Sequence, residues 1–304
     1  MSTTPAAASL DAASLDDLHT RVLRWYDERA RDLPWRAADR TPWGVLVSEV
    51  MLQQTPVTRV LPQWLAWMER WPTPCDLAAA APGEAVRAWD RLGYPRRALR
   101  LHAAAVAIRD EHGGVVPDDH AQLLSLPGIG TYTAAAVASF AFGQRHAVVD
   151  TNVRRVHARA VTGAAEPATA LTSAEQRLAV ALLPQDAPTA ARWAVAVMEL
   201  GALVCTARSP RCDDCPLLDR CAWVLAGRPA HDGPARRGQA WAGTDRQVRG
   251  KLLAVLRASA DPVPARDLEA CWPDARQRAR CLDGLVADGL VEPLEDGRFT
   301  LPRT

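Results

Sequence analysis

Four closely spaced cysteines constrain this chain of 304 residues more than any other feature. They follow the pattern Cys205-x6-Cys212-x2-Cys215-x5-Cys221, and the N-terminus lacks the basic and apolar runs of a signal peptide. Thiols at this density, in a chain without signs of secretion, predict a metal centre rather than disulfides. Tetrahedral zinc and a four-iron, four-sulfur cluster both take four cysteinates, so the spacing alone leaves both open.

Apolar residues recur at helical spacing through most of the chain, and no alternating strand pattern precedes residue 285. The pattern therefore predicts an all-α fold. Helices are expected over residues 15–30, 43–55, 57–71, 78–92, 96–111, 121–126, 131–142, 151–161, 172–183 and 189–203.

The composition changes after the cysteines. Residues 227–243 are rich in Gly, Pro and Arg, which predicts a linker, and residues 1–14 read as a disordered polar tail. Three helices are expected over residues 244–258, 264–271 and 275–288, followed by a hairpin around Glu295-Asp296-Gly297. Residues 244–304 are therefore expected to form a small winged-helix-like module.

The charge pattern argues for local rather than general attraction to nucleic acid. The net charge is only +1, but residues 91–109 and 151–165 contain several arginines and no acid. Such stretches predict contacts with a phosphate backbone. We expect a soluble, cytoplasmic and nucleoid-associated monomer.

Two glycines and an aspartate stand at helix starts. Leu126-Pro-Gly128-Ile-Gly130 lies between two expected helices, which is typical of a helix–hairpin–helix that grips a DNA phosphate without reading sequence. Asp150 ends an apolar run directly before a helix, where a carboxylate caps the helix and is favoured in its ionised form.

A second carboxylate, Glu49, lies in an apolar helix between Val47 and Val50. Burying it ionised is costly, so it either has a partner or has a raised pKa and serves as a general acid. Gln53 and Gln54 follow it and carry amides suited to the edges of bases.

The order of these motifs resembles that of the adenine DNA glycosylases of the endonuclease III superfamily. The resemblance covers roughly residues 15–226 and rests on Leu-Pro-Trp35-Arg36, Ser48-Glu49-Val-Met-Leu-Gln-Gln-Thr55, Gly93-Tyr94, the hairpin, Asp150-x-Asn152 and the cysteines. It implies a helix–hairpin–helix glycosylase fold with a six-helix domain over residues 36–147. It also implies an iron–sulfur domain from residues 15–35 and 148–226, with a [4Fe-4S] cluster on Cys205, Cys212, Cys215 and Cys221.

The resemblance further implies a reaction. Adenine mispaired with 8-oxoguanine or guanine in double-stranded DNA would be flipped out and protonated by Glu49. Ionised Asp150, facing Glu49 across a cleft, would stabilise the sugar cation, and Tyr132 and Asn152 would assist. Further positions match the adenine pocket (Trp35, Arg36, Leu52), the wedge beside the opposing base (Gln54, Tyr94) and the DNA contacts (Gln53, Gly128, Gly130).

The lysine content decides between two kinds of glycosylase. Bifunctional members of the superfamily carry a Schiff-base lysine two residues after the second hairpin glycine, where this chain has Tyr132. Lys251 is the only lysine and lies outside the expected catalytic region, which predicts a monofunctional enzyme without lyase activity.

Two alternatives stay open at this stage. One is the same scaffold with thymine or oxidised-pyrimidine specificity, and the other is a non-catalytic, DNA-binding iron–sulfur protein. The family's usual Nudix-like C-terminal domain is not recognisable, so the C-terminal module either binds DNA or caps the structure.

Overall fold

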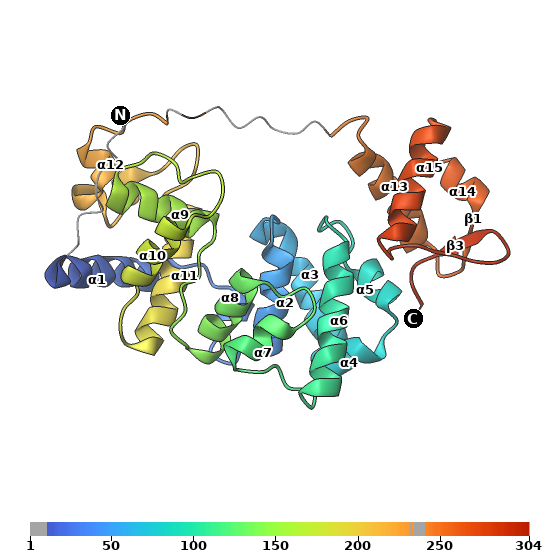
Figure 1. Cartoon of the computed structure of the whole chain (residues 1–304), viewed down its shortest axis with the longest axis horizontal. Coiled ribbons are helices and arrows are strands. Elements are labelled where there is room, and N and C mark those ends of the chain that lie inside the picture. Colours follow the sequence, from blue (N-terminus) through green and yellow to red (C-terminus); the bar gives the residue numbers. More distant parts are fainter. Residues whose placement is uncertain (1–10, 232, 234–240, 304) are drawn as a thin grey trace. The chain divides into compact units, whose positions relative to one another are not determined.

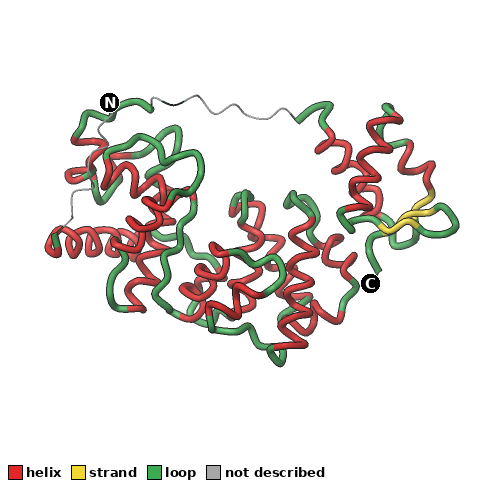
Figure 2. Tube along the Cα trace, viewed as in Figure 1, coloured by secondary structure: helices red, strands yellow, loops and turns green. Residues whose placement is uncertain are grey.

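The computed structural model describes residues 11–231, 233 and 241–303, and most of them are helical (Figure 2). The strands of this described part all lie in the C-terminal module. The parts of the expected tail and linker at residues 1–10, 232 and 234–240 lie outside the described residues. No described helix is both long and apolar enough to span a bilayer.

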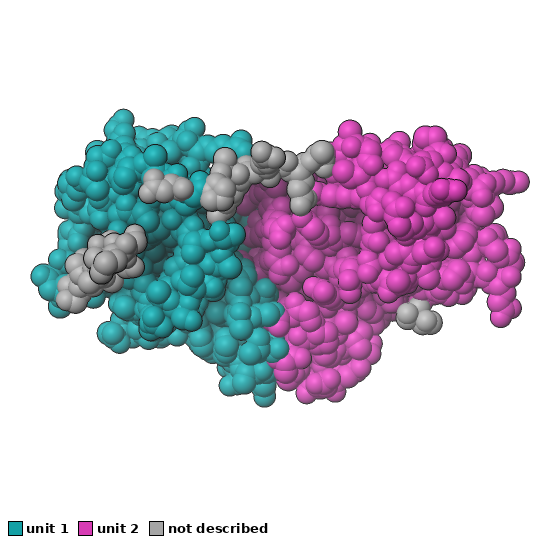
Figure 3. Space-filling view, turned by 45° about the horizontal axis from the view of Figure 1, so that its top comes forward, with its two compact units in different colours: residues 1–45, 118–124, 130–234 teal, residues 46–117, 125–129, 235–304 magenta. Residues whose placement is uncertain are grey.

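The chain divides into two compact units (Figure 3). One unit comprises residues 1–45, 118–124 and 130–234, and the other comprises residues 46–117, 125–129 and 235–304. These boundaries differ from those expected for the domains, because residues 131–142 belong with the cysteine loop and the C-terminal module belongs with residues 46–117.

The first unit is built around one long N-terminal helix. Leu18, Val22 and Trp25 lie on one face of α1 and pack against apolar residues of α9 and α11 such as Val153 and Trp193. This apolar stripe follows the helical period, and the Asp11 carboxylate caps the helix by accepting from the Ser14 amide at 2.8 Å. Its helices are α1 (Ala12–Arg29), η1 (Pro34–Arg36), α8 (Thr131–Phe142), α9 (Thr151–His157), η2 (Ala158–Thr162), α10 (Ser173–Ala181), α11 (Ala187–Leu203), η3 (Cys212–Asp214), η4 (Leu218–Arg220) and α12 (Ala222–Leu225).

The helical part of the second unit has a core of tryptophans. The ring of Trp67 makes edge contacts with the rings of Trp71 and Trp89, and its indole donates to the Ala88 carbonyl at 2.9 Å. The helices are α3 (Val57–Arg70), α4 (Pro74–Ala79), α5 (Pro82–Ala88) and α6 (Arg96–Glu111). Two further helices, α2 (Pro42–Leu52) and α7 (His120–Ser125), contribute residues to both units.

One helix boundary was predicted wrongly. The sequence pattern predicted a single helix over residues 78–92, but α4 ends at Ala79 and α5 begins at Pro82. Proline lacks an amide hydrogen and forces the preceding residue out of the helical region, and Ala81 is extended with ψ 142°. Pro82 therefore begins a new helix at the position that proline tolerates best.

The C-terminal module combines three helices with a small antiparallel sheet (Figure 1). Its helices are α13 (Asp245–Ala258), α14 (Ala265–Glu269) and α15 (Ala275–Ala287), and its strands are β1 (Val263–Pro264), β2 (Glu292–Pro293) and β3 (Arg298–Thr300). The strand order is β1-β3-β2, with Val263 opposite Phe299 and Glu292 opposite Thr300. The two-residue strand β1 was not predicted, because it has no alternating pattern and is defined only by its pairing with β3. Gly297 supplies the expected hairpin turn at φ 79°.

The buried histidine of α9 couples the stability of the first unit to pH. His157 is buried, and this burial lowers its pKa to about 4. Its Nε2 atom has no hydrogen-bond partner in the described part of the chain. The folded chain therefore keeps this imidazole neutral at pH values where the unfolded chain protonates it.

We expect acid to destabilise the fold through His157. Because the folded pKa lies below the unfolded value of about 6.5, lowering the pH from about 7 to about 5 should cost roughly 2 kcal/mol. Thermal unfolding of the wild type and of His157→Gln across this pH range tests it, with exposed His231→Gln as the control. Equal acid sensitivity in all three chains would contradict the assignment.

Candidate functional site

Asp150 is held in place by two hydrogen bonds at the start of α9. Its Oδ1 atom accepts from the Val153 amide at 2.7 Å, which confirms the expected helix cap, and its Oδ2 atom accepts from Asn152 Nδ2 at 2.7 Å. Burial raises the pKa of Asp150, while these hydrogen bonds act in the opposite direction. The carboxyl group is thus half-buried and oriented at both oxygens.

Arg155 connects this carboxylate to the cysteine loop. Its Nη2 atom donates to Asn152 Oδ1 and to the Gly201 carbonyl, both at 2.7 Å, and its Nε atom donates to the Cys205 carbonyl at 2.6 Å. Gly201 is needed for this close approach, because a Cβ atom there would lie 2.7 Å from the Cβ atom of Asn152. One buried guanidinium therefore fixes the amide that orients Asp150 and the start of the loop.

The four cysteines line one pocket, together with Arg159 and Trp223. Two short helices, η3 and η4, fold the loop so that thiols far apart along it share this pocket. Four cysteinates that share one pocket are the ligand set of tetrahedral zinc or of a four-iron, four-sulfur cluster.

Arg159 supplies the positive charge beside the thiols. It is buried, its Nη1 atom lies 3.6 Å from Cys205 Sγ, and its guanidinium stacks over the Trp223 ring at 4.8 Å. Two arginines of the cysteine loop pair with acids instead, Arg211 with Asp214 and Arg220 with Asp17. The charge next to the thiols therefore comes from Arg159 in η2, which follows α9.

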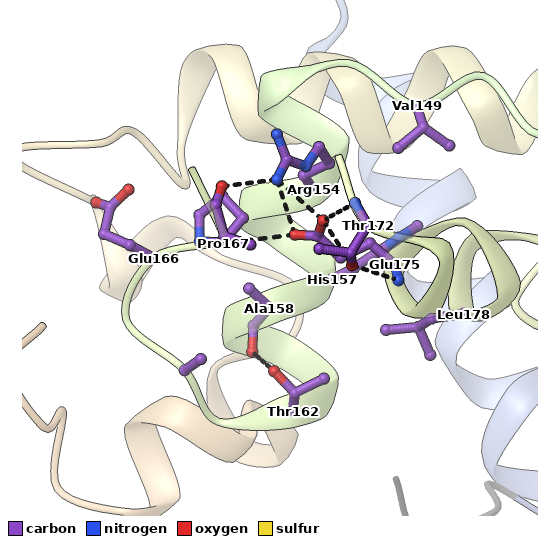
Figure 4. Close-up of a pocket in the computed structure, with 12 residues that line it drawn as sticks. Val149, Arg154, His157, Ala158, Thr162, Glu166, Pro167, Thr172, Glu175 and Leu178 are labelled. Atoms are coloured by element: carbon purple, nitrogen blue, oxygen red, sulfur yellow. Dashed lines mark hydrogen bonds and ion pairs between the residues drawn. The ribbon is translucent and has the colours of Figure 1, made fainter. Parts of the chain in front are cut away.

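The expectation that residues 151–165 form a phosphate-binding patch was wrong. Arg154, Arg155, His157 and Arg159 are all buried, and the three arginines donate to groups inside the unit. Figure 4 shows Arg154 held by Glu175, with Nη2 2.9 Å from Oε2, beside a pocket of about 180 Å³ that His157 also lines. These arginines stabilise the interior of the unit, because their donors already bind acceptors there.

A buried ion-pair network holds Arg36. Glu199 is fully enclosed on α11 and accepts from Arg31 Nη2 at 2.7 Å and from Arg36 Nη2 at 2.9 Å. Burial alone would raise the pKa of Glu199, but the hydrogen bonds and charges of the two arginines outweigh it and lower the pKa to about 2. Arg36 Nη1 is buried without a partner among the described residues, so one donor remains for a ligand.

The remaining predicted residues near the base lie in both units. Glu49 is only 5% exposed on α2, as its apolar neighbours predicted, and Leu52 and Gln53 are half-buried. In the other unit Trp35 is buried in η1, and Tyr132 is half-buried near the start of α8. Glu49 belongs to one unit and Asp150 to the other, and their facing each other stays a prediction.

Arg97 joins the two loops that carry Gln54 and Tyr94. Its Nη1 atom donates to the carbonyls of residues 50, 51 and 53 at 2.6–3.1 Å, and its Nη2 atom donates to Thr55 Oγ1 and to the carbonyls of residues 92 and 93 at 2.9–3.3 Å. Burial lowers the pKa of Arg97 to about 10, which leaves it charged at neutral pH.

Both of these loops place a non-glycine residue in the left-handed region. Gln54 has φ 56° and Tyr94 has φ 48°, and both side chains are exposed. Such strained residues persist only where the surroundings hold them, and they concentrate at functional sites. Arg97 provides that support from the buried side of both loops.

The hairpin between α7 and α8 requires its first glycine. Gly128 has φ 77°, and a Cβ atom there would lie 2.6 Å from the Cβ atom of Arg100. Gly130 caps α8 with open space in front of it, since no atom lies within 4 Å of where its Cβ would be. The predicted basic stretch 91–109 is thus mixed, because Arg100 is exposed at the hairpin whereas Arg97 is buried.

Comparisons with known proteins agree with this geometry. Residues 47–178 match the model of the HhH-GPD superfamily of base excision DNA repair proteins, and residues 205–221 match the iron–sulfur binding domain of endonuclease III. The fold is similar to that of a thermostable thymine-DNA glycosylase, with TM-score 0.61 and 26% identity over 71% of this chain and 100% of that one. It is also similar to endonuclease III in a non-covalent DNA complex, with TM-score 0.60 and 24% identity over 72% of this chain and 98% of that one. The class is therefore a helix–hairpin–helix DNA glycosylase that carries an iron–sulfur cluster.

Whole-chain relatives define the family. An adenine DNA glycosylase of Mycobacterium tuberculosis is 56% identical over 284 residues, which cover 93% of each chain. That of Mycolicibacterium smegmatis is 58% identical over 282 residues, covering 92% of this chain and 94% of the relative. The human adenine DNA glycosylase is 38% identical over 90% of this chain and 47% of its own length. The chain belongs to the adenine DNA glycosylase family, and the predicted fold class, enzyme class and [4Fe-4S] cofactor are confirmed.

Four residues that organise the site were missed from the sequence, namely Arg97, Arg155, Arg159 and Glu199. Two of them carried a usable signal. Arg97 lies four residues before Leu101 and eleven before Ile108 on the apolar face of α6, and Glu199 lies between Met198 and Leu200 in an apolar helix. A charge at an apolar position of a helix predicts a buried, partnered ion.

We expect Arg155→Lys to impair both the cofactor and the catalytic carboxylate. A lysine carries its donors on a single nitrogen and cannot span the acceptors that Arg155 reaches from Nε and Nη2, so the substitution should lower activity about 10- to 100-fold. Iron content, visible absorbance of the cluster and single-turnover rate measure the effect. Exposed Arg208→Lys is the matched control, and equal behaviour of the two variants would refute a special role for Arg155.

Proposed function

We propose that this chain removes adenine mispaired with 8-oxoguanine or guanine from double-stranded DNA by simple hydrolysis. The observation that carries the proposal is Asp150, a half-buried carboxylate oriented at both oxygens by Val153 and Asn152. Cleaving an N-glycosidic bond requires a fixed negative charge near a developing sugar cation. Adenine as the base is supported by relatives that are 56–58% identical over more than nine-tenths of the chain.

The adenine would be held by Trp35, Arg36 and Leu52. Trp35 offers an aromatic ring, and Arg36 Nη1 is a buried donor without a partner among the described residues. Adenine carries ring nitrogens that accept hydrogen bonds, so a fixed guanidinium suits it. Glu199 holds Arg36 through its other terminal nitrogen and thereby sets the direction of the free donor.

The DNA would be held by backbone contacts and by the two strained loops. Gly128 and Gly130 open the hairpin to a phosphate, with exposed Arg100 beside it. Gln54 and Tyr94 are exposed on the loops joined by Arg97, in positions suited to wedge beside the opposing base. Gln53, half-buried beside them, would contribute its amide.

In the reaction, Glu49 donates a proton to the flipped adenine, and the C1′–N9 bond breaks with its electron pair leaving on the base. Asp150, ionised, stabilises the positive charge at C1′. A water molecule then adds to C1′ and loses a proton, and the product is an abasic sugar. Tyr132 and Asn152 assist, the latter by holding Asp150 Oδ2.

Cys205, Cys212, Cys215 and Cys221 would bind the [4Fe-4S] cluster. The bound cluster supplies a rigid four-point connection across the loop that follows α11. The charge of Arg159 beside Cys205 Sγ suits a thiolate ligand. Arg155 connects the loop to Asn152 by donating to the Cys205 carbonyl and to Asn152 Oδ1.

The lack of a catalytic lysine supports a monofunctional enzyme. Lys251, the only lysine, lies on α13 with its ammonium 5.0 Å from the Trp272 ring centre, and Tyr132 occupies the position of the Schiff-base lysine. We therefore expect borohydride to trap no covalent adduct between the chain and lesion-containing DNA. An adduct that maps to a lysine, with endonuclease III as the positive control, would refute this mechanism.

We expect Glu49→Gln and Asp150→Asn to retain binding of a duplex but to lose excision by at least about 100-fold. Single-turnover rates and the identity of the released base, measured on duplexes with adenine, thymine or an oxidised pyrimidine opposite guanine or 8-oxoguanine, provide the test. Release of thymine or of an oxidised pyrimidine in place of adenine would favour the alternative specificity. Near-wild-type rates in either variant would refute the assigned roles.

A further inference from the structure

The C-terminal module is joined to α5 by hydrogen bonds to main-chain atoms and to α6 by an ion pair. The Gly83 amide donates to the Pro302 carbonyl at 2.7 Å, and Arg257 Nε donates to the Val86 carbonyl at 3.0 Å. Arg87 donates back to the carbonyl of Arg257, and Arg96 pairs with Asp288 at 3.1 Å. Contacts with main-chain atoms fix the position of the module more firmly than surface ion pairs alone would.

The charge of this module does not suit a separate DNA-binding domain. Between Thr244 and Thr304 ten Arg and Lys residues face ten Asp and Glu residues, so the module is neutral. Within its helices, Arg249 pairs with Asp288, Arg280 with Asp245, and Lys251 stacks on Trp272. A neutral surface lacks the excess of cations on which phosphate binding depends.

Arg246 differs from these residues, because it stacks on an aromatic ring outside the module. Its guanidinium carbon lies 5.0 Å from the Trp241 ring centre and 5.6 Å from that of Tyr94. The guanidinium of Arg97 lies 5.7 Å from the same Tyr94 ring. Tyr94, half-exposed and at φ 48°, is thus contacted by one arginine from its own helical region and one from the C-terminal module.

We propose that the C-terminal module supports Tyr94 through Arg246, a positioning residue, and acts on the strand opposite the excised base only through this ring. The inference rests on the proposed function, which takes Tyr94 to meet the opposing base. The module then neither binds DNA by itself nor merely caps the fold. It completes a wedge whose strained loop needs support on both sides.

A double-mutant cycle tests this. The probe is a fluorescent duplex with a tetrahydrofuran abasic analogue opposite 8-oxoguanine, and anisotropy gives its affinity for the full chain with its cluster. Arg246→Ala should weaken binding about two- to fivefold when Tyr94 is present and not further when Tyr94→Ala is already made. Arg276→Ala, an exposed arginine of the same module, should leave the affinity unchanged. An equal loss in both backgrounds, or an equal loss in Arg276→Ala, overturns the proposal.

Salt dependence separates positioning from direct phosphate contact. Each phosphate contact adds about 0.9 to the slope of log affinity against log salt concentration. Arg246→Ala should leave this slope unchanged, and a decrease of about one overturns the proposal in favour of a backbone contact.

A second variant reaches the same contact without changing Arg246. In Gly83→Val the new Cβ atom would lie 2.5 Å from the Pro302 carbonyl oxygen, so the module must shift away from α5. It should reproduce the loss seen with Arg246→Ala, and unchanged affinity overturns the proposal. Adenine release by the unmodified chain is measured separately. Its absence would refute the proposed function, while the affinity cycle would still report whether Arg246 acts through Tyr94.

Discussion

The first unit depends on the hydrogen bonds that the buried guanidinium of Arg155 donates. Removing a guanidinium from water is costly unless each donor finds an acceptor, and here the acceptors come from α9, α11 and the cysteine loop. The charge is stable only while all three segments keep their places. The side chain of Arg155 therefore sets the position of Asn152, which orients Asp150. The same side chain holds the carbonyl of Cys205, where the cysteine loop begins.

The second unit uses the same solution at Arg97. Two loops that are far apart in sequence each expose a strained residue, and one guanidinium donates hydrogen bonds to carbonyls of both loops. A lysine could not perform either task, since its single ammonium lacks the planar fork that reaches several carbonyls at fixed angles. The near-absence of lysine from this chain fits that requirement, although the exposed arginines have no such need.

Sequence reasoning recovered what depends on local pattern. The bounds of α6 and α8, the caps at Asp150 and Thr244, the turn glycine Gly297 and the burial of Glu49 all follow from nearest neighbours along the chain. It failed where a tertiary contact decides. Arg154 and Arg159 looked like an exposed basic patch because a linear count of charges cannot distinguish a solvated cation from one whose acceptors arrive from residues 165–207. The two-residue strand β1 was missed for the same reason, since only its pairing with β3 makes it a strand.

The proposed role of Tyr94 beside the opposing base places a physical demand on its loop. A residue that discriminates between guanine and 8-oxoguanine must be held rigidly. A loop that relaxes on binding would bind both bases with similar affinity. Tyr94 sits in a conformation that an L-residue rarely adopts, so the rigidity has to come from outside the loop. Arg97 and Arg246 contact the ring from different parts of the second unit, and Gly83 allows the module to approach closely enough for the latter contact. Under the proposal, a small neutral module would influence the choice of opposing base through a single side chain, which requires rigid docking of the module to α5.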